Sequence, residues 1–205
     1  MTVTQPSLTV VGLGYVGLPL VQEACRSGLL VVGLDTNAFV VTGLMSGESH
    51  IDDLDSTDIA RMLEFGFTAT DEPACIGESD VVVVCVPTPL DASGTPDLGA
   101  VKAATQAVSE NLCPGTLVVL ESTTYPGTTE DTVRPLLEEG SGLMAGVDFN
   151  LAYSPERIDP GNPEWGLRNT PKIVGGLTPA CTERAAQFYE KIVDTVVRTV
   201  GLREA

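Results

Sequence analysis

Short apolar runs alternate with helical patterns along most of the chain. The runs are rich in β-branched residues and are continuous, which is typical of strands buried on both faces of a parallel sheet. They lie at 8–13, 29–35, 80–86, 115–122 and 149–154. Helical patterns fill the intervals, at 16–27, 37–46, 56–65, 98–111 and 128–139. This alternation predicts βαβ units and an α/β fold with a doubly wound, mostly parallel sheet.

The last part of the chain continues the pattern with shorter pieces. We expect a strand at 171–176, a helix at 179–192 and a final strand at 195–200. The most irregular segment is 87–97, which carries three prolines and follows the end of a strand. We interpret residues 1–205 as one domain, with a core at 1–120 and a set of loops with an extension at 121–205. Because the chain stops soon after a strand, we expect further domains beyond it.

The net charge of the chain argues against one class of binding partner. The chain has 28 acidic and 11 basic side chains, a net charge of −17. Such a field repels phosphate backbones and argues against nucleic acid as a partner. No apolar run reaches the roughly 18–20 residues that span a bilayer. The N-terminal residues MTVTQPS lack the basic region of a signal peptide, so we expect a cytoplasmic protein without membrane contact.

The cysteines do not form a recognisable metal or disulfide pattern. Five are scattered without a C-x-x-C pair, and the chain has one histidine, His50. Metal sites of the zinc type need clustered ligands, so we expect no metal. We interpret the cysteines as small buried apolar residues of a reducing compartment.

A glycine-rich turn follows the first predicted strand. Gly12, Gly14 and Gly17 form the G-x-G-x-x-G pattern and open a helix. In this setting the first glycine permits a tight turn and the second lets a pyrophosphate approach the backbone. The third lets the helix pack close to the strand. The alternative interpretation is a strand, turn and helix that bind no ligand. The acidic residue described in the next paragraph argues against it.

The second predicted strand ends in Asp35, 18 residues after Gly17. An acid at this place accepts hydrogen bonds from the ribose of a dinucleotide. Thr36 and Asn37 follow it, so no neighbouring base is available for a 2′-phosphate. The sequence therefore predicts a Rossmann-like domain that binds NAD rather than NADP, although the motif by itself also permits FAD.

Three further loops follow predicted strands and should line the same crevice. They are CVPTP at 85–89, ESTTYPGTT at 121–129 and YSPERIDPGNP at 153–163. Glu156 and Arg157 lie in the last of them. A salt bridge within the loop would also explain either residue, but three such loops together indicate a site.

The four motifs in this order resemble the UDP-glucose/GDP-mannose dehydrogenase family, and most of all its bacterial UDP-N-acetylglucosamine or UDP-N-acetylmannosamine 6-dehydrogenases. The resemblance covers essentially the whole chain and corresponds to the NAD-binding domain. It implies that the central helix and the C-terminal nucleotide-sugar domain, which holds the catalytic cysteine, are absent from this chain. Cys85, at a strand end, is then a wall of the cofactor pocket.

The resemblance implies oxidation of the C6 alcohol of a UDP-sugar, with a UDP-N-acetylhexosamine favoured, to the uronate in two NAD-dependent steps. An aldehyde forms first, the cysteine captures it, and a thioester is then hydrolysed. It implies that Glu156 is a general base or positions water, helped by Thr123. This fragment alone is expected to be inactive, and the parent protein is expected to be a homodimer or a larger assembly.

The resemblance also implies contacts. Those to NAD are assigned to Gly12, Gly14, Tyr15, Val16, Gly17, Asp35, Pro87, Thr88, Thr123 and Thr129, and those to the nucleotide sugar to Arg157 and Ile158. Val40 and Gly99 depart from residues common in relatives.

Two other interpretations stay open at this point. One is a β-hydroxyacid dehydrogenase N-terminal domain, and the other is a stand-alone, non-catalytic NAD-binding or redox-sensing module.

Overall fold

The computed structural model describes residues 7–90, 94–157 and 164–205. These residues build an eight-stranded sheet with the order β3-β2-β1-β4-β5-β6-β7-β8. The strands are β1 (Ser7–Val11), β2 (Leu30–Leu34), β3 (Thr68–Thr70), β4 (Val81–Val84), β5 (Leu117–Leu120), β6 (Asn150–Tyr153), β7 (Lys172–Gly176) and β8 (Val196–Arg198). Neighbouring strands are parallel except β6 and β7, which run antiparallel. The predicted doubly wound, mostly parallel sheet is confirmed.

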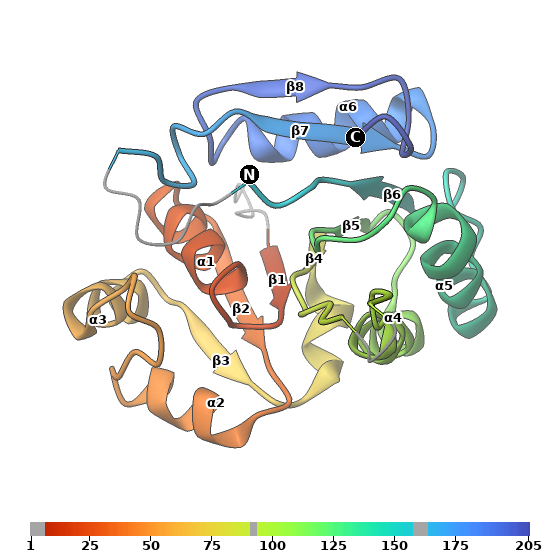
Figure 1. Ribbon diagram of the computed structural model, residues 1–205. Coiled ribbons are helices and arrows are strands. Elements are labelled where there is room, and N and C mark those ends of the chain that lie inside the picture. Colours follow the sequence, from red (N-terminus) through yellow and green to blue (C-terminus); the bar gives the residue numbers. More distant parts are fainter. Residues whose placement is uncertain (1–6, 91–93, 158–163) are drawn as a thin grey trace, which may run out of the picture.

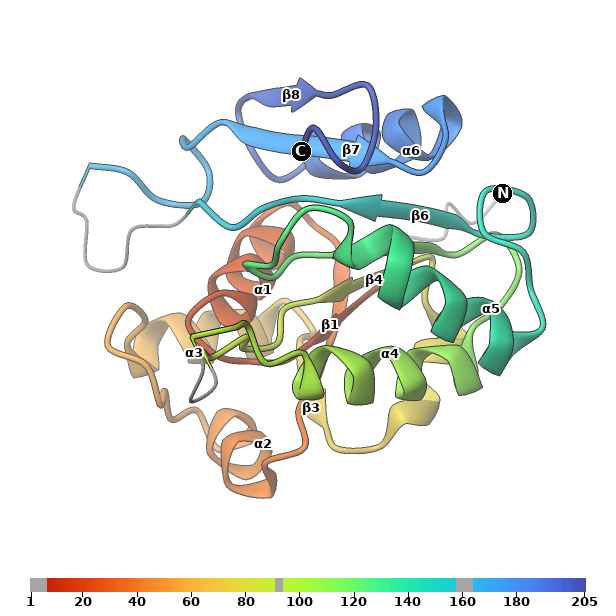
Figure 2. The same cartoon turned by 45° about the vertical axis from the view of Figure 1, so that its right-hand side comes forward.

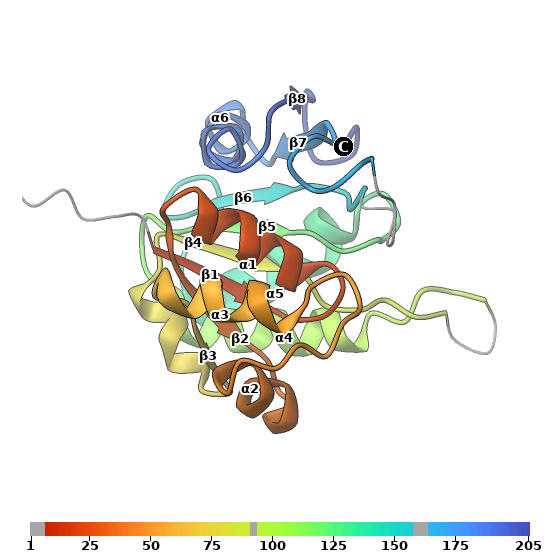
Figure 3. The same ribbon diagram turned by 90° about the vertical axis from the view of Figure 1, so that its left-hand side faces the viewer.

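Helices cover both faces of this sheet (Figure 1). They are α1 (Gly17–Arg26), α2 (Ala38–Met45), α3 (Ser56–Glu64), α4 (Gly99–Asn111), α5 (Arg134–Ser141) and α6 (Pro179–Tyr189). A 3₁₀ segment, η1 (Pro73–Glu78), and a π-helical segment, η2 (Thr129–Val133), complete the elements. Figure 2 brings α4 and α5 to the front of the sheet, whereas Figure 3 shows α1 and α3 in front of it.

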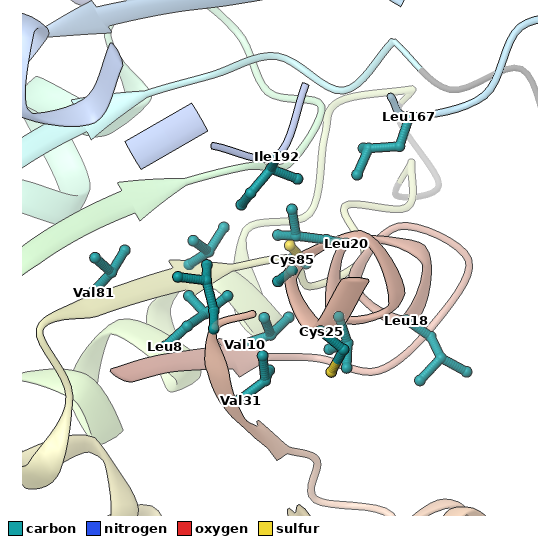
Figure 4. Packing of buried hydrophobic residues seen from close by; sticks show 14 of the residues in the cluster. Leu8, Val10, Leu18, Leu20, Cys25, Val31, Val81, Cys85, Leu167 and Ile192 are labelled. Atoms are coloured by element: carbon teal, nitrogen blue, oxygen red, sulfur yellow. The ribbon is translucent and has the colours of Figure 1, made fainter. Parts of the chain in front are cut away.

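The central strands β1, β4 and β5 are buried on both faces, as their continuous apolar runs predict. In β4, Val81 and Val83 belong to one apolar cluster, which α1, α3 and α6 complete. Val82 and Val84 belong to a second cluster on the opposite face, with α4 and α5. Figure 4 shows the first cluster at close range, with side chains from α1 over those of β1 and β4. Successive side chains point to opposite faces of a strand, so one apolar run contributes side chains to both clusters.

The structure differs from the predicted elements in two places. The edge strand β3 and the segment η1 were not predicted, because β3 has only three residues and none is fully buried. The helix expected at 128–139 divides into η2 and α5. Pro135 lies in the first turn of α5 and has no N–H to give to the preceding turn, which explains the wider turn before it.

The antiparallel strand β7 fixes the geometry at one end of the sheet. Its register pairs Ala152 with Gly176 and Tyr153 with Gly175. Continued by three residues, this register places Glu156 opposite Lys172. Strands β7 and β8 and helix α6 lie together beyond β6 (Figures 1 and 2).

Candidate cofactor and active site

The three glycines of the first turn have different surroundings. Gly12 has φ +93°, and a Cβ there would lie 2.6 Å from the carbonyl oxygen of Cys85. A Cβ at Gly17 would lie 1.9 Å from the carbonyl oxygen of Gly12. Gly14 has no described atom within 4 Å of a Cβ, so it faces open space. The first and third glycines are therefore required by close packing, and the second leaves room for a ligand.

The N-terminus of α1 is left open to a ligand. Its N-cap residue, Val16, makes no side-chain hydrogen bond within the described chain, and the first turn holds no acid. By contrast, α2, α3 and α6 begin with side-chain caps from Asn37, Asp55 and Thr178. An uncapped helix N-terminus offers N–H groups and the positive end of the helix dipole to an anion. This arrangement fits a pyrophosphate.

Asp35 lies beside the glycine turn. Its Oδ2 atom accepts a hydrogen bond of 2.9 Å from the main-chain nitrogen of Leu13, and its Oδ1 atom accepts one of 2.9 Å from Asn37. His50 holds the same turn from another side, with Nε2 2.8 Å from the carbonyl oxygen of Leu13. The carboxylate retains further lone pairs that can accept from ribose hydroxyls.

A cleft of about 750 Å³ runs along the carboxyl ends of β1, β2, β4 and β5. This volume lies within the ~300–1,000 Å³ usual for ligand sites. Its walls include these predicted contact residues: Gly12, Gly14, Tyr15, Val16, Asp35, Pro87, Thr88 and Thr123. Sequence reasoning missed His50 and four alanines of α4, namely Ala100, Ala103, Ala104 and Ala107, which also line it. Because alanine side chains are small, this wall of the cleft is apolar and projects little into it.

Two predicted cofactor residues lie elsewhere. Gly17 packs beneath the cleft against Gly12 and does not line it. Thr129 is buried at the start of η2 and lines a second, smaller cavity. Their assignment to NAD contact stays a prediction.

The second cavity has a volume of about 250 Å³. It lies between residues 123–130, the segment after β6, and residues 202–205. Glu156 and Arg157 both line it, and Thr123 lines this cavity and the large cleft alike. The Thr88 hydroxyl donates a hydrogen bond of 2.5 Å to the carbonyl oxygen of Thr123, which ties the two strand ends together. Ile158, the other predicted sugar contact, lies outside the described residues.

Glu156 is held from two sides. Its Oε1 atom accepts a hydrogen bond of 2.6 Å from the main-chain nitrogen of Arg157. Its Oε2 atom lies 3.5 Å from the Nζ atom of Lys172. The side chain of Glu156 is only 8% exposed. One base that pairs with it, Lys172, therefore comes from β7.

Sequence reasoning missed the residues behind Glu156. The Oε1 atom of Glu121 lies 2.5 Å from Lys172 Nζ, and Tyr189 donates a hydrogen bond to Oε2 of Glu121. Lys172 also lies 5.4 Å from the centre of the Tyr189 ring. A signal was present, because Glu121 follows the apolar run LVVL and Lys172 opens another strand. Charged residues are almost never fully buried unless paired.

Burial and mutual charge set the protonation of these groups. Burial, with a further contribution from Glu156, raises the pKa of Glu121 to about 7 although Lys172 opposes the shift. For Lys172, burial lowers the pKa, but the two carboxylates outweigh it and the net shift is upward. Burial and the Glu121 charge raise the pKa of the Cys85 thiol well above its usual range. Cys85 therefore stays a thiol and is a poor nucleophile.

Two further properties of the described residues bear on other classes of function. Three or more histidine, cysteine or acidic side chains do not gather into a candidate metal site in the described part of the chain. Among the helices of residues 7–90, 94–157 and 164–205, none has the length and apolar character that a membrane crossing requires.

Comparison with known proteins places the chain in a family. Residues 6–193 match the NAD-binding domain of the UDP-glucose/GDP-mannose dehydrogenase family, and the chain belongs to this family. It is 38% identical over 188 residues to the UDP-N-acetyl-D-glucosamine 6-dehydrogenase of Pseudomonas aeruginosa, covering 91% of this chain and 43% of that protein. It is 38% identical to the UDP-N-acetyl-D-mannosamine dehydrogenase of Pyrococcus horikoshii, covering 93% and 45% respectively.

Solved structures agree with this placement. The UDP-D-ManNAc dehydrogenase of Pyrococcus horikoshii superposes with a TM-score of 0.90 at 35% identity, over 96% of this chain and 47% of that one. The NDP-N-acetyl-D-galactosaminuronic acid dehydrogenase of Methanosarcina mazei gives 0.91 at 33% identity, over 98% and 45%. The chain thus spans a little under half the length of these relatives. It is an NAD-binding domain, and neither alternative from the sequence is favoured.

Proposed function

We propose that this chain is the NAD-binding part of a nucleotide-sugar 6-dehydrogenase that oxidises the C6 alcohol of a UDP-N-acetylhexosamine to the uronate. The observation that carries the proposal is the adjacency of two cavities. The cleft with the glycine turn and the cavity with Glu156 share Thr123 as a common wall. The names of the relatives in Pseudomonas aeruginosa and Pyrococcus horikoshii support the substrate class.

In this proposal the residues of the large cleft hold NAD, which accepts hydride from the substrate when bound. The uncapped start of α1 receives the pyrophosphate beside Gly14, and Asp35 accepts hydrogen bonds from the adenosine ribose. A 2′-phosphate would meet the Asp35 carboxylate without a nearby cation, because Thr36 and Asn37 follow it. NAD is therefore the preferred cofactor.

Glu156 accepts a proton in the smaller cavity. During hydrolysis of a thioester, the oxygen of a water molecule bonds to the acyl carbon, its proton passes to Glu156, and the cysteine sulfur leaves. Thr123, on the wall of both cavities, helps to order this water. Arg157, on the rim of the same cavity, meets the nucleotide sugar. A positioned general base typically contributes roughly 10²–10⁴-fold to the rate.

The nucleophilic cysteine is supplied by another part of the polypeptide in this proposal. Burial raises the pKa of Cys85 well above its usual range, and that of Cys25 to about 12, so neither is suited to attack an aldehyde. The relatives are about twice as long as this chain, which leaves room for the missing group. We further propose a cytoplasmic location and a homodimer or larger assembly for the parent protein.

The test uses the complete polypeptide that the gene encodes. It is mixed with NAD and UDP-N-acetylglucosamine, and the formation of NADH and uronate is followed. The proposal expects two NADH for each uronate. UDP-N-acetylmannosamine and UDP-glucose, tested in parallel, identify the preferred sugar. Absence of NADH with all three, in a preparation that binds NAD, would refute the proposed function.

A further inference from the structure

A buried cluster of ionisable side chains lies between the two cavities. The side chains of Glu121 and Lys172 are 0% and 3% exposed, and their Oε1 and Nζ atoms are 2.5 Å apart. Tyr189 donates to the other oxygen of Glu121, and Glu156 reaches the same Nζ atom at 3.5 Å. Charges withdrawn from water are costly even when paired, and apolar residues of similar size often stabilise a fold as well. The cluster therefore indicates a role beyond packing.

The strands bring these residues together through side-chain alternation. Cys85 and Glu121 each lie two residues after a member of the apolar cluster that faces α1 and α6. The register of β4 with β5 places them side by side at the carboxyl end of the sheet. The continued register of β6 with β7 places Glu156 opposite Lys172. The ends of neighbouring strands thus bring four polar side chains close together, those of Cys85, Glu121, Glu156 and Lys172.

The cluster has one ammonium for two carboxyls. Lys172 Nζ lies nearer to Glu121, at 2.5 Å, than to Glu156, at 3.5 Å. The other titratable groups in the cluster, Tyr189 and Cys85, both have pKa values raised by burial and by the Glu121 charge, so they stay neutral. When Glu121 is ionised, its carboxylate neutralises most of the positive charge of Lys172. Lys172 then holds the Glu156 carboxylate less tightly.

The two carboxyls border different cavities. Glu121 lines the NAD cleft, and Glu156 lines the smaller cavity. A change in the charge of Glu121 therefore acts on Glu156 both directly and through Lys172, although Glu121 does not line the smaller cavity. Such coupling between close buried groups is strong, because the screening by water is weak there.

We propose that Glu121 is a positioning residue for Glu156: by holding the Lys172 ammonium, it keeps the Glu156 carboxylate oriented towards the smaller cavity. This inference rests on the proposed function of Glu156. Burial and Glu156 raise the pKa of Glu121 to about 7, so the support that it gives is gained as the pH rises through that value. Below it, Glu121 is neutral and the ammonium is drawn towards Glu156 and away from Glu121.

The first test measures the pH profile of steady-state turnover in the complete gene product. In Glu121→Gln, Lys172 has only Glu156 to neutralise, so we expect hydrolysis to slow about tenfold or more, a larger effect than any change in KM for NAD. The rise in kcat through about pH 7 should disappear. Lys172→Met removes the cation and should shift the pH profile of kcat. Its rise on the acid side should then lie at a higher pH. The control is Glu23→Gln, which alters another buried glutamate, paired with Arg26 on α1.

The second test needs no sugar and uses this 205-residue chain. Glutamate side-chain carboxyls are labelled with carbon-13 and titrated by NMR. We expect a carboxyl that titrates near pH 7, present in the wild type and in Glu23→Gln and absent from Glu121→Gln. This test is independent of whether the parent protein oxidises a nucleotide sugar.

The outcomes are distinct. Loss of the rise in kcat through about pH 7 in Glu121→Gln and its shift to higher pH in Lys172→Met, with the NMR transition near pH 7, support the inference. Lower melting temperatures with an unchanged pH profile would mean that the cluster is only structural and would overturn it. An NMR titration without the transition near pH 7 would also overturn it. An inactive wild-type protein with the expected NMR transition would refute the proposed function while confirming the charge coupling.

Discussion

Asp35, at the end of β2, accepts a hydrogen bond of 2.9 Å from the main-chain nitrogen of Leu13 in the glycine turn after β1. The acid proposed to bind ribose and the turn proposed to bind pyrophosphate are thus joined within the protein. The second oxygen of the carboxylate is fixed by Asn37, also at 2.9 Å. Because both elements are already positioned, little conformational freedom is lost on binding, which favours affinity.

The two glycines Gly14 and Gly17 should respond differently to alanine. In Gly17→Ala the new Cβ would meet the Gly12 carbonyl oxygen at 1.9 Å, so we expect a loss of about 3 kcal/mol in the free energy of unfolding. In Gly14→Ala the Cβ enters open space, so stability should stay within about 1 kcal/mol of the wild type. NAD binding should weaken at least about tenfold, because the methyl group occupies the place of the pyrophosphate. Thermal melting and calorimetry measure the two effects, and equal melting temperatures for both variants would contradict this account.

Glu121 should make stability depend on pH in a defined direction. Its pKa is raised by burial from 4.5 to about 7, so between these values the folded state binds the proton more tightly than the unfolded chain. Its contribution to the free energy of unfolding therefore falls as the pH rises from about 4.5 to about 7. Relative to the wild type, Glu121→Gln should gain roughly 1–3 kcal/mol over this range. Denaturant melts at several pH values check this, with Glu23→Gln as control; a constant difference would contradict the prediction.

Glu156→Gln in the complete gene product should separate hydride transfer from hydrolysis. The glycine turn and Asp35 are untouched, so NAD binding should be normal. We expect a burst of NADH followed by a steady state roughly 10²–10⁴-fold slower, with a sugar adduct retained on the catalytic cysteine. Mass spectrometry of the intact protein detects the adduct. A stable, fully active variant without adduct would remove Glu156 from the reaction.

The isolated 205-residue chain should form no NADH from UDP-N-acetylglucosamine. It carries Glu156 and Thr123, but its Cys25 and Cys85 thiols have pKa values raised by burial and are poor nucleophiles. An assay of the purified chain, with NAD binding verified in the same preparation, measures this. Steady NADH production would show that the chain holds a complete active site.

The order of elements and the NAD cleft could be predicted because their signals are local. Continuous β-branched runs announce buried parallel strands, and the glycine turn with Asp35 lies within one βαβ unit. The edge strand β3 was not predicted because three residues carry too little periodicity. The π-helical turn of η2 escaped because it depends on how the chain accommodates Pro135.

The cluster behind Glu156 could not be predicted because it depends on strand order and direction. Glu121 and Lys172 are 51 residues apart in sequence. Their contact requires β7 to run antiparallel to β6, which the apolar pattern does not reveal. For the same reason, the sequence offered a salt bridge within the loop only as an alternative for Glu156 and gave no sign of Lys172, which the structure brings across from the neighbouring strand.

The most direct test of the account is a calorimetric titration of this chain with NAD and with NADP. The cleft that joins Asp35 to the glycine turn predicts one bound NAD per chain, with NADP at least about tenfold weaker because its 2′-phosphate meets a carboxylate and the described lining of the cleft holds no lysine or arginine. Asp35→Ala should weaken NAD binding and remove most of the preference. Equal affinity for NAD and NADP in the wild-type chain, or no binding of either, would contradict the assignment of this cleft.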